Sequence, residues 1–259
     1  MEGTSHGSVI HAAGVAELLW RAPGGPPRAL GVVPLLMGDR PAVALPWAHV
    51  EDARAAAASP QAALVLSDRR LTGSAWRPLA LTGRLTLVED GDGELFAADL
   101  LRQEVRKHPP SRALVDSPML RRENWWYLAR LILLLDVTDE EAVAPRDTSD
   151  QAVLGVDDDG LVVRTVTVGD WSADPMPLTG GPLTAGGPAA LIGQEVSVPD
   201  AERWTVHVTT GRYADGQLAE VVPAARRELE PVPGLLARMR RQRALERACV
   251  AALRRAGHG

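Results

Sequence analysis

Two histidines stand where the chain could carry out chemistry at a bound ligand. His49 falls between a predicted strand and a predicted helix, and from there its ring could donate to a ligand or bind a metal. His108 precedes Pro109 at a predicted helix end, where a cation suits the helix dipole. No two histidines are four residues apart, so the sequence does not predict a two-histidine metal site on a helix.

Arginines and tryptophans on or beside predicted strands are the other candidates for ligand binding. Arg77 and Arg84 are seven residues apart, so an alternating strand points them to opposite faces. We expect Arg84, which shares the less apolar face, to reach a ligand, and Arg77 to stay in solvent. Trp47 and Trp76 could stack on a planar ligand, because a large ring offers contact area at little entropic cost. Packing in the core is the alternative role for both tryptophans.

Composition excludes several classes of protein. Cys249 is the only cysteine, which rules out an intramolecular disulfide and a multi-cysteine zinc or iron–sulfur site. No Gly-x-Ser-x-Gly segment marks a nucleophilic serine. The formal net charge of −5 argues against a general nucleic-acid binder. We expect a cytoplasmic protein that does not enter a membrane, because the chain shows no signal-peptide pattern and no apolar run of membrane-spanning length.

Hydrophobic periodicity predicts the elements that position these residues. In the first part of the chain it predicts a helix over 8–20, a hairpin within 30–47, a helix over 51–59, strands over 62–68 and 77–89, a helix over 95–107 and a strand over 127–137. Beyond these it predicts a hairpin over 153–169, a long loop over 172–188, strands within 189–222 and a helix over 233–255. We therefore predict a first domain at 1–143, a linker at 144–151 and a C-terminal β region at 152–259.

A stretch of the first half has a possible second copy. Residues 61–85 and 188–212 share Ala-Ala-Leu, a tryptophan and Gly-Arg at spacings of 127 or 128 residues. Two copies of one β unit would let a single chain build both halves of a site. The alternative is coincidence in a composition rich in alanine and β-branched residues.

The C-terminal helix is strongly basic. It carries Arg238, Arg240, Arg241, Arg243, Arg247, Arg254 and Arg255. One interpretation is an electrostatic patch for a nucleic acid or an acidic partner. The other, which the acidic remainder of the chain favours, is a docked helix with one solvated face.

Four segments of the first half carry a family resemblance. They are AELLWRAPGGPPRALGVVPL at 16–35, ARAAAASPQAALVL at 53–66, RPLALTGRLTLVED at 77–90, and EVRKHP with the later WWYLARLILLLDV. Together with the order of elements they resemble the pyridoxamine 5′-phosphate oxidase-like, FMN-binding split β-barrel family over about residues 9–140. The resemblance implies an antiparallel split barrel with flanking helices. It also implies a cofactor site at a homodimer interface, or within one chain acting as a pseudo-dimer if the repeat is a duplication.

The resemblance also implies where a flavin would bind. The family holds the flavin phosphate with basic side chains and hydroxyls around the short helix and the strand before it. Arg54 matches one basic position, Asp52 replaces the second, and Pro46, Trp47 or Ala48 replaces the usual Ser or Thr. The cofactor-binding residues expected on this basis are Arg54, Arg84, Trp47, His49 and Trp76.

Three functions follow from the resemblance and the departures from it. The first is an FMN-binding oxidoreductase that acts on a small-molecule ligand. The second is a cofactor-free binding or regulatory protein that has kept the barrel and lost the flavin site, which Asp52 and the missing hydroxyls favour. The third is a haem-binding split barrel, because relatives that bind haem can use a histidine near the C-terminus, where His258 stands.

Overall fold

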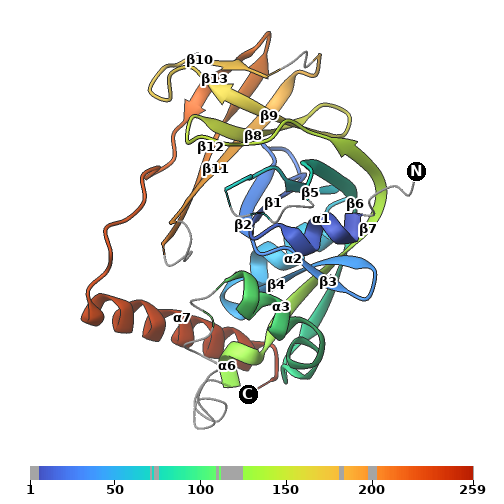
Figure 1. The fold of residues 1–259 in the computed structure, drawn as a ribbon, viewed down its shortest axis with the longest axis vertical. Coiled ribbons are helices and arrows are strands. Elements are labelled where there is room, and N and C mark those ends of the chain that lie inside the picture. The colour runs from blue at the N-terminus through green and yellow to red at the C-terminus, as the bar shows by residue number, and fades with distance from the viewer. Residues whose placement is uncertain are drawn as a thin grey trace.

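The protein folds into two antiparallel sheets with helices around the first of them (Figure 1). A computed structural model describes residues 6–70, 72, 76–108, 111, 125–180, 184–197 and 203–258. The two sheets confirm the predicted α+β class. Within these ranges, no helix has the length and apolar character needed to cross a membrane.

The first sheet has the strand order β2-β1-β5-β6-β7-β4-β3. Its strands are β1 (Ala16–Trp20), β2 (Arg28–Val32), β3 (Leu35–Met37), β4 (Arg40–Pro46), β5 (Ala62–Leu66), β6 (Leu79–Asp90) and β7 (Arg130–Ala142). The predicted hairpin within 30–47 is β3 and β4, while β2 pairs with β1. The strongly apolar run from Leu131 to Leu135 lies in β7, buried between β6 and β4, as its composition predicts.

Short helices surround the first sheet. They are α1 (His6–Ala12), the 3₁₀ turn η1 (Trp47–His49), α2 (Val50–Ala58), the π-helical turn η2 (Phe96–Leu100), α3 (Leu101–Lys107) and α6 (Trp125–Leu128). α2 is the predicted alanine-rich helix, since alanine has the highest helix propensity. It ends at Ser59 in an extended conformation because the residue before a proline avoids the helical region, and Pro60 follows.

Two sequence predictions were wrong. The helix predicted over 8–20 ends at Ala12, and residues 16–20 form strand β1, all five of them buried. A short apolar run buried on both faces has no alternation to distinguish it from a helix. The loop predicted over 172–188 contains β10 (Met176–Thr179), whose alternating burial spans only four residues; residues 181–183 lie outside the described ranges.

The second sheet closes into a ring with the order β10-β13-β12-β11-β8-β9. Its other strands are β8 (Gln151–Asp157), β9 (Leu161–Val168), β11 (Gly187–Val196), β12 (Trp204–Ala214) and β13 (Gln217–Val222). Read from β9, this order follows that of the first sheet read from β2 over six strands: a hairpin, three antiparallel strands and one strand from earlier in the chain. The first sheet has β3 as an additional seventh strand at its edge.

The register of the two sheets also agrees at the predicted repeat. Ala62 of β5 lies opposite Gly83 of β6, and Ala189 of β11 lies opposite Gly211 of β12. The shared Ala and Gly of the two copies are therefore cross-strand partners in both sheets. This is the arrangement that a duplication predicts.

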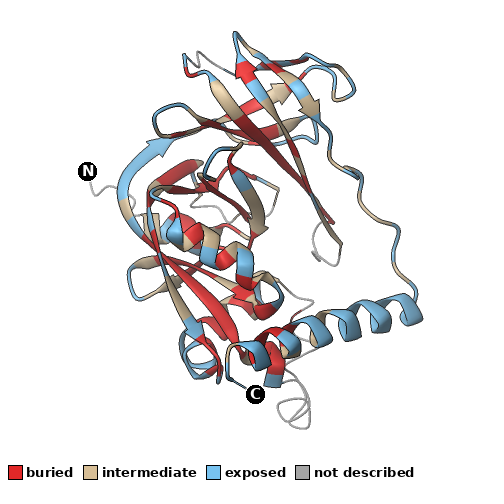
Figure 2. Cartoon of the chain, turned by 180° about the vertical axis from the view of Figure 1, so that it is seen from behind, coloured by how far each residue is buried: buried red, intermediate tan, exposed pale blue. Residues whose placement is uncertain are grey.

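The two sheets pack against each other through an apolar layer. Leu19, Ala63, Val65 and Ala80 of the first sheet meet Val153, Leu161, Val163 and Ile192 of the ring. Red, buried residues accordingly gather where the sheets face each other in Figure 2. This contact buries both faces of β1 and β5, which explains why these strands lack alternation.

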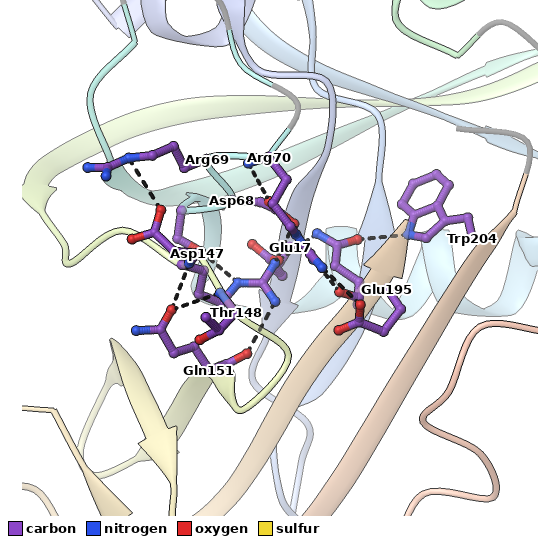
Figure 3. Close-up of polar contacts among 12 residues, drawn as sticks. Glu17, Asp68, Arg69, Arg70, Asp147, Thr148, Gln151, Glu195 and Trp204 are labelled. Carbon is purple, nitrogen blue, oxygen red and sulfur yellow. Dashed lines mark hydrogen bonds and ion pairs between the residues drawn. The ribbon is translucent and has the colours of Figure 1, made fainter. Parts of the chain in front are cut away.

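A buried polar cluster lies where the first sheet meets the ring (Figure 3). Arg146, 1% exposed, forms ion pairs with Glu17 of β1 and with Asp68 just beyond β5. Asp68 also binds Arg70, which reaches across to Glu195 of β11 at 2.9 Å. The cluster thus joins the first sheet, the segment between the two sheets, and the ring.

The C-terminal helix α7 (Leu235–Arg255) is only partly docked. Its last turns bury Cys249, Ala252 and Leu253 against the first sheet's core, whereas its first turns are exposed and project from the body (Figure 2). The docked-helix interpretation is confirmed for the C-terminal half of α7. Exposed Leu235 and Leu236 begin the other half.

Candidate functional site

One cavity opens beside the β1–β2 hairpin, and we call it the hairpin cavity. Its volume is about 550 Å³. It is lined by Trp20, Arg21, Ala22, Pro23, Gly24, Arg28, Ala55, Ala58, Ser59, Pro60 and Asp157. Hairpin and α2 residues form most of the wall, and Asp157 comes from β8 of the ring. The cavity therefore lies between the two halves of the chain.

Two arginines and one carboxylate, Asp157, are the charged residues that line the hairpin cavity. Arg28 Nη2 lies 2.8 Å from Asp52 Oδ1, and Arg21 Nη2 lies 2.8 Å from Asp157 Oδ1. The guanidinium carbon of Arg28 also lies 5.9 Å from the ring centre of Trp20, its cross-strand partner next to the turn of the hairpin. Because both arginines are partly exposed, their ion pairs are screened by solvent and contribute little stability. An anion entering the cavity could therefore compete for both guanidinium groups.

Asp52 contacts one lining residue of the hairpin cavity and one lining residue of a second cavity. Its other carboxylate oxygen lies 3.5 Å from Nδ1 of His49, which is the residue before α2. Asp52 therefore interacts with Arg28 on one side and His49 on the other. The guanidinium of Arg28 partly offsets the negative charge of Asp52.

The second cavity, which we call the histidine cavity, has a volume of about 310 Å³. Its walls come from β2, β4 and the end of α3, with Trp204 from the ring and Leu245 from α7. His49 and His108 both line it, although they are 59 residues apart in the sequence. The structure thus brings together the two histidines that the sequence singled out.

Buried polar groups form one wall of the histidine cavity. Glu104 accepts hydrogen bonds from Tyr127 at 2.6 Å and Ser111 at 3.2 Å, and pairs with Arg130 at 3.3 Å. Ser111 is also 2.9 Å from Nδ1 of His108. Burial raises the pKa of Tyr127 and lowers the pKa of His108, so both side chains stay neutral around neutral pH. Because Glu104 is bound by Tyr127, Ser111 and Arg130, these groups form a structural network at the cavity wall.

The two arginines predicted to bind the phosphate lie away from both cavities. Arg54 extends from α2 to Glu89 of β6, with Nη2 2.8 Å from the carboxylate, and half of its side chain is exposed. Arg84 is exposed on β6 opposite Asp136. Arg77, expected in solvent, is exposed and pairs with Glu140. The role of Arg54 and Arg84 in phosphate binding stays a prediction.

The two predicted stacking tryptophans are packed against the core. Trp47 is fully buried in the first sheet's core, and its ring centre lies 5.3 Å from that of His258. Trp76 is partly buried against the same core. Neither tryptophan lines the hairpin or the histidine cavity. His258, the residue considered for haem, also lines neither of them.

Sequence reasoning missed the residues that do line the hairpin cavity. Trp20, Arg21 and Arg28 were assigned to the end of a helix and the breaker after it. The sequence does carry a signal for this site, because Arg21 and Arg28 flank the Gly/Pro-rich turn APGGPP. A hairpin interpretation of 16–32 would have placed both arginines at the end where the chain turns.

Comparisons with known proteins find similarity to solved structures. No protein-family model matches the chain, and no curated protein matches it. The Agrobacterium tumefaciens protein Atu2129, of unknown function, is 19% identical with a TM-score of 0.36; the match covers 51% of this chain and spans about half, 52%, of that protein.

Two further neighbours are described by their ligands. A haem-binding protein from Mycobacterium smegmatis is 13% identical with a TM-score of 0.36, covering 100% of both chains. A pyridoxamine 5′-phosphate oxidase-related, FMN-binding protein from Nostoc punctiforme is 13% identical with a TM-score of 0.30, covering 78% of this chain and 91% of that one. The structural neighbours thus include proteins of the split-barrel kind that the sequence resembles.

Proposed function

We propose that this chain binds FMN in the hairpin cavity and acts as a flavin-dependent oxidoreductase. The observation that carries the proposal is a cavity of about 550 Å³ where two arginines and an apolar wall face the same space. Pockets for small ligands and cofactors are typically about 300–1,000 Å³, mostly apolar, with a few convergent polar groups. The hairpin cavity has all three properties.

The residues present fit a phosphate-bearing planar cofactor. Arg21 and Arg28 would hold the phosphate, because a guanidinium binds phosphate oxygens in a bidentate manner. Trp20 and the small side chains Ala55 and Ala58 of α2 would bound the ring. When bound, the flavin supplies hydride or electron transfer, and the protein supplies binding and orientation.

The position of the cavity supports an intrachain pseudo-dimer. Asp157 of the ring lines the cavity together with the β1–β2 hairpin and α2 of the first sheet. Both halves of one chain would therefore contribute to a single binding site.

Titration with FMN tests the assignment of the phosphate ligand. Arg28→Ala should weaken FMN binding by at least about tenfold, the loss expected for a hydrogen bond to a charged group. Arg54→Ala is the matched control, because Arg54 is also about half exposed and also pairs with one carboxylate. Its affinity should stay within about twofold of the wild type. Flavin fluorescence quenching measures both.

The opposite pattern would contradict the assignment. If Arg54→Ala lost affinity while Arg28→Ala kept it, the phosphate would lie at the position that the sequence resemblance implies. If both variants bind FMN as tightly as the wild type, neither arginine binds the phosphate.

Asp52→Asn should tighten FMN binding by a few-fold at low salt. The substitution frees Arg28 from its carboxylate partner and removes a negative charge near the incoming dianion. The gain should shrink as salt is added, because exposed charges are screened. Glu89→Gln, which frees Arg54 in the same way, should leave affinity unchanged. An unchanged or weaker affinity of Asp52→Asn would count against Arg28 as the anchor.

A cofactor-free binding or regulatory protein is the second candidate function. The observation that favours it is the placement of Arg54 and Trp47, one bound to Glu89 and the other buried in the core. A wild-type protein that binds neither FMN nor haem would support this candidate over the first.

A further inference from the structure

A third cavity lies on the ring and shares no lining residue with the proposed flavin site. Its volume is about 330 Å³, and we call it the β12 cavity. It is lined by Ser149, Glu195, His207, Arg227, Glu228 and Leu229. β11 and β12 supply Glu195 and His207, the segment between the two sheets supplies Ser149, and the connection from β13 to α7 supplies the rest.

Arg227 is the cation of this cavity. Its guanidinium carbon lies 4.1 Å from the ring centre of Trp171, so a cation–π contact orients the group. Within the described part of the chain, Arg227 has no ion pair or hydrogen bond, whereas Arg21, Arg28, Arg70 and Arg146 are all paired with carboxylates. An oriented guanidinium beside a cavity is suited to binding an oxyanion.

His207 lies next to Trp171 and lines the same cavity as Arg227. It is 3% exposed, and neither of its ring nitrogens has a hydrogen-bond partner among the described residues. Its ring meets Trp171 edge-on, with 5.2 Å between the centroids. Burial, together with nearby Arg227 and Arg146, lowers the pKa of His207 to about 4, so the ring is neutral at physiological pH. One ring nitrogen is then an N–H donor that lacks an acceptor.

The backbone opposite His207 is shaped to admit this ring. A Cβ atom at Gly193 would lie 2.3 Å from Nε2 of His207, closer than any side chain allows. Gly193 pairs directly with His207 across β11 and β12. Gly193 therefore leaves room for the buried ring of His207. The ring nitrogens form no hydrogen bond with the described residues, and a buried polar group without a partner destabilises a fold.

Two carboxylates also line the cavity, and both interact electrostatically with Arg227. Glu195 is held by Arg70 at 2.9 Å, which offsets its charge. Glu228 is exposed at the rim. Ser149 adds a hydroxyl, which can donate to an anion.

We propose that the β12 cavity binds a small organic oxyanion, a carboxylate or phosphate ester, through Arg227 and Ser149, with Trp171 and His207 supporting the site. The volume of the cavity is at the lower end of the range for small-molecule sites. The ligand is thus expected to be smaller than a flavin, and this site to be independent of the hairpin cavity.

Isothermal titration of the full chain with benzoate, phenyl phosphate and inorganic phosphate tests the proposal. Benzoate and phenyl phosphate represent the two organic sources of an oxyanion, and inorganic phosphate represents the oxyanion alone. The wild type should bind benzoate or phenyl phosphate, and Arg227→Met should weaken that binding at least about tenfold. Arg226→Met is the matched control, since Arg226 is the neighbouring arginine and pairs with Glu230 instead. It should keep the wild-type affinity.

Several outcomes would overturn the proposal. One is the absence of binding of either organic probe up to about 10 mM. Another is binding that Arg227→Met and Arg226→Met reduce equally, or that neither reduces. Binding of inorganic phosphate alone would also overturn it, because the proposal requires an organic ligand. Arg227 is partly exposed, so Arg227→Met should fold, and an unchanged unfolding midpoint checks this.

Discussion

Arg146→Met is expected to lower the free energy of unfolding by about 3–5 kcal/mol, the usual effect of removing one partner from a buried ion pair. Arg146 is 1% exposed and bound to Glu17 and Asp68, which are equally buried. Without the guanidinium, Glu17 remains in the protein interior without its ion-pair partner, and Asp68 keeps only Arg70. Urea denaturation measures the loss.

The cluster around Arg146 contains few groups that could compensate. Glu17 Oε1 also accepts a hydrogen bond from Gln194 at 2.5 Å, while Glu17 Oε2 has no partner among the described residues. Arg70 already binds both Asp68 and Glu195. The large expected effect follows from this shortage of cations near Glu17.

A second readout separates lost charge pairing from lost packing. Burial raises the pKa of Glu17, and the charge of Arg146 opposes that rise. Removing Arg146 should raise the pKa of Glu17 further in the folded state. A carboxyl with a raised folded pKa contributes stability at low pH that is lost as pH rises through that pKa. The deficit of Arg146→Met should therefore be smaller at acidic pH than at neutral pH.

The control for Arg146 is an exposed arginine in a single ion pair. Arg164 lies 2.6 Å from Glu141, with about a third of its side chain exposed. Arg164→Met should change stability by no more than about 1 kcal/mol, as for other surface pairs. Equal effects of the two substitutions, or a deficit that does not depend on pH, would show that Arg146 does not act through its buried ion pairs.

Trp47→Ala is expected to destabilise the fold by about 3–5 kcal/mol, typical of truncating a buried aromatic side chain. Trp47 is fully buried in the first sheet's core and contacts the ring of His258. The cavity left behind lies among the residues on which α7 docks. Thermal or urea unfolding measures the loss, with Trp125→Ala as a control, because Trp125 is 42% exposed. That control should change stability far less.

The same variant distinguishes the two roles that the sequence leaves open for Trp47. If the tryptophan packs in the core, FMN affinity measured on the folded fraction should be unchanged. A variant that keeps the wild-type stability and loses FMN would instead support stacking on the flavin ring.

Much of the fold could be predicted from sequence patterns that local physics controls. The alanine-rich α2, the alternating β6 and the β8–β9 hairpin all appear where the sequence places them. The strand at 16–20 could not be recognised, because the ring buries its outer face and removes the alternation. A tertiary contact thus decided the secondary structure of the segment that leads into the hairpin cavity.

The candidate site was less predictable for the same reason. His49 was recognised from its place before a helix, and it lines a cavity. Arg21 and Arg28 were missed because their location depends on the β1–β2 hairpin and on Asp157 from the other half of the chain. Glu104, Tyr127 and Arg130 come together only through the packing of α3 and α6 near β7, which no short motif in the sequence indicates.

The most direct test of the central claim is dialysis of the purified chain against FMN, followed by gel filtration and an absorption spectrum. We expect the wild type to retain the flavin absorption bands and a variant with both Arg21→Ala and Arg28→Ala to lose them. A folded wild-type protein that emerges without flavin, or that acquires a Soret band from haem instead, would contradict FMN binding in the hairpin cavity.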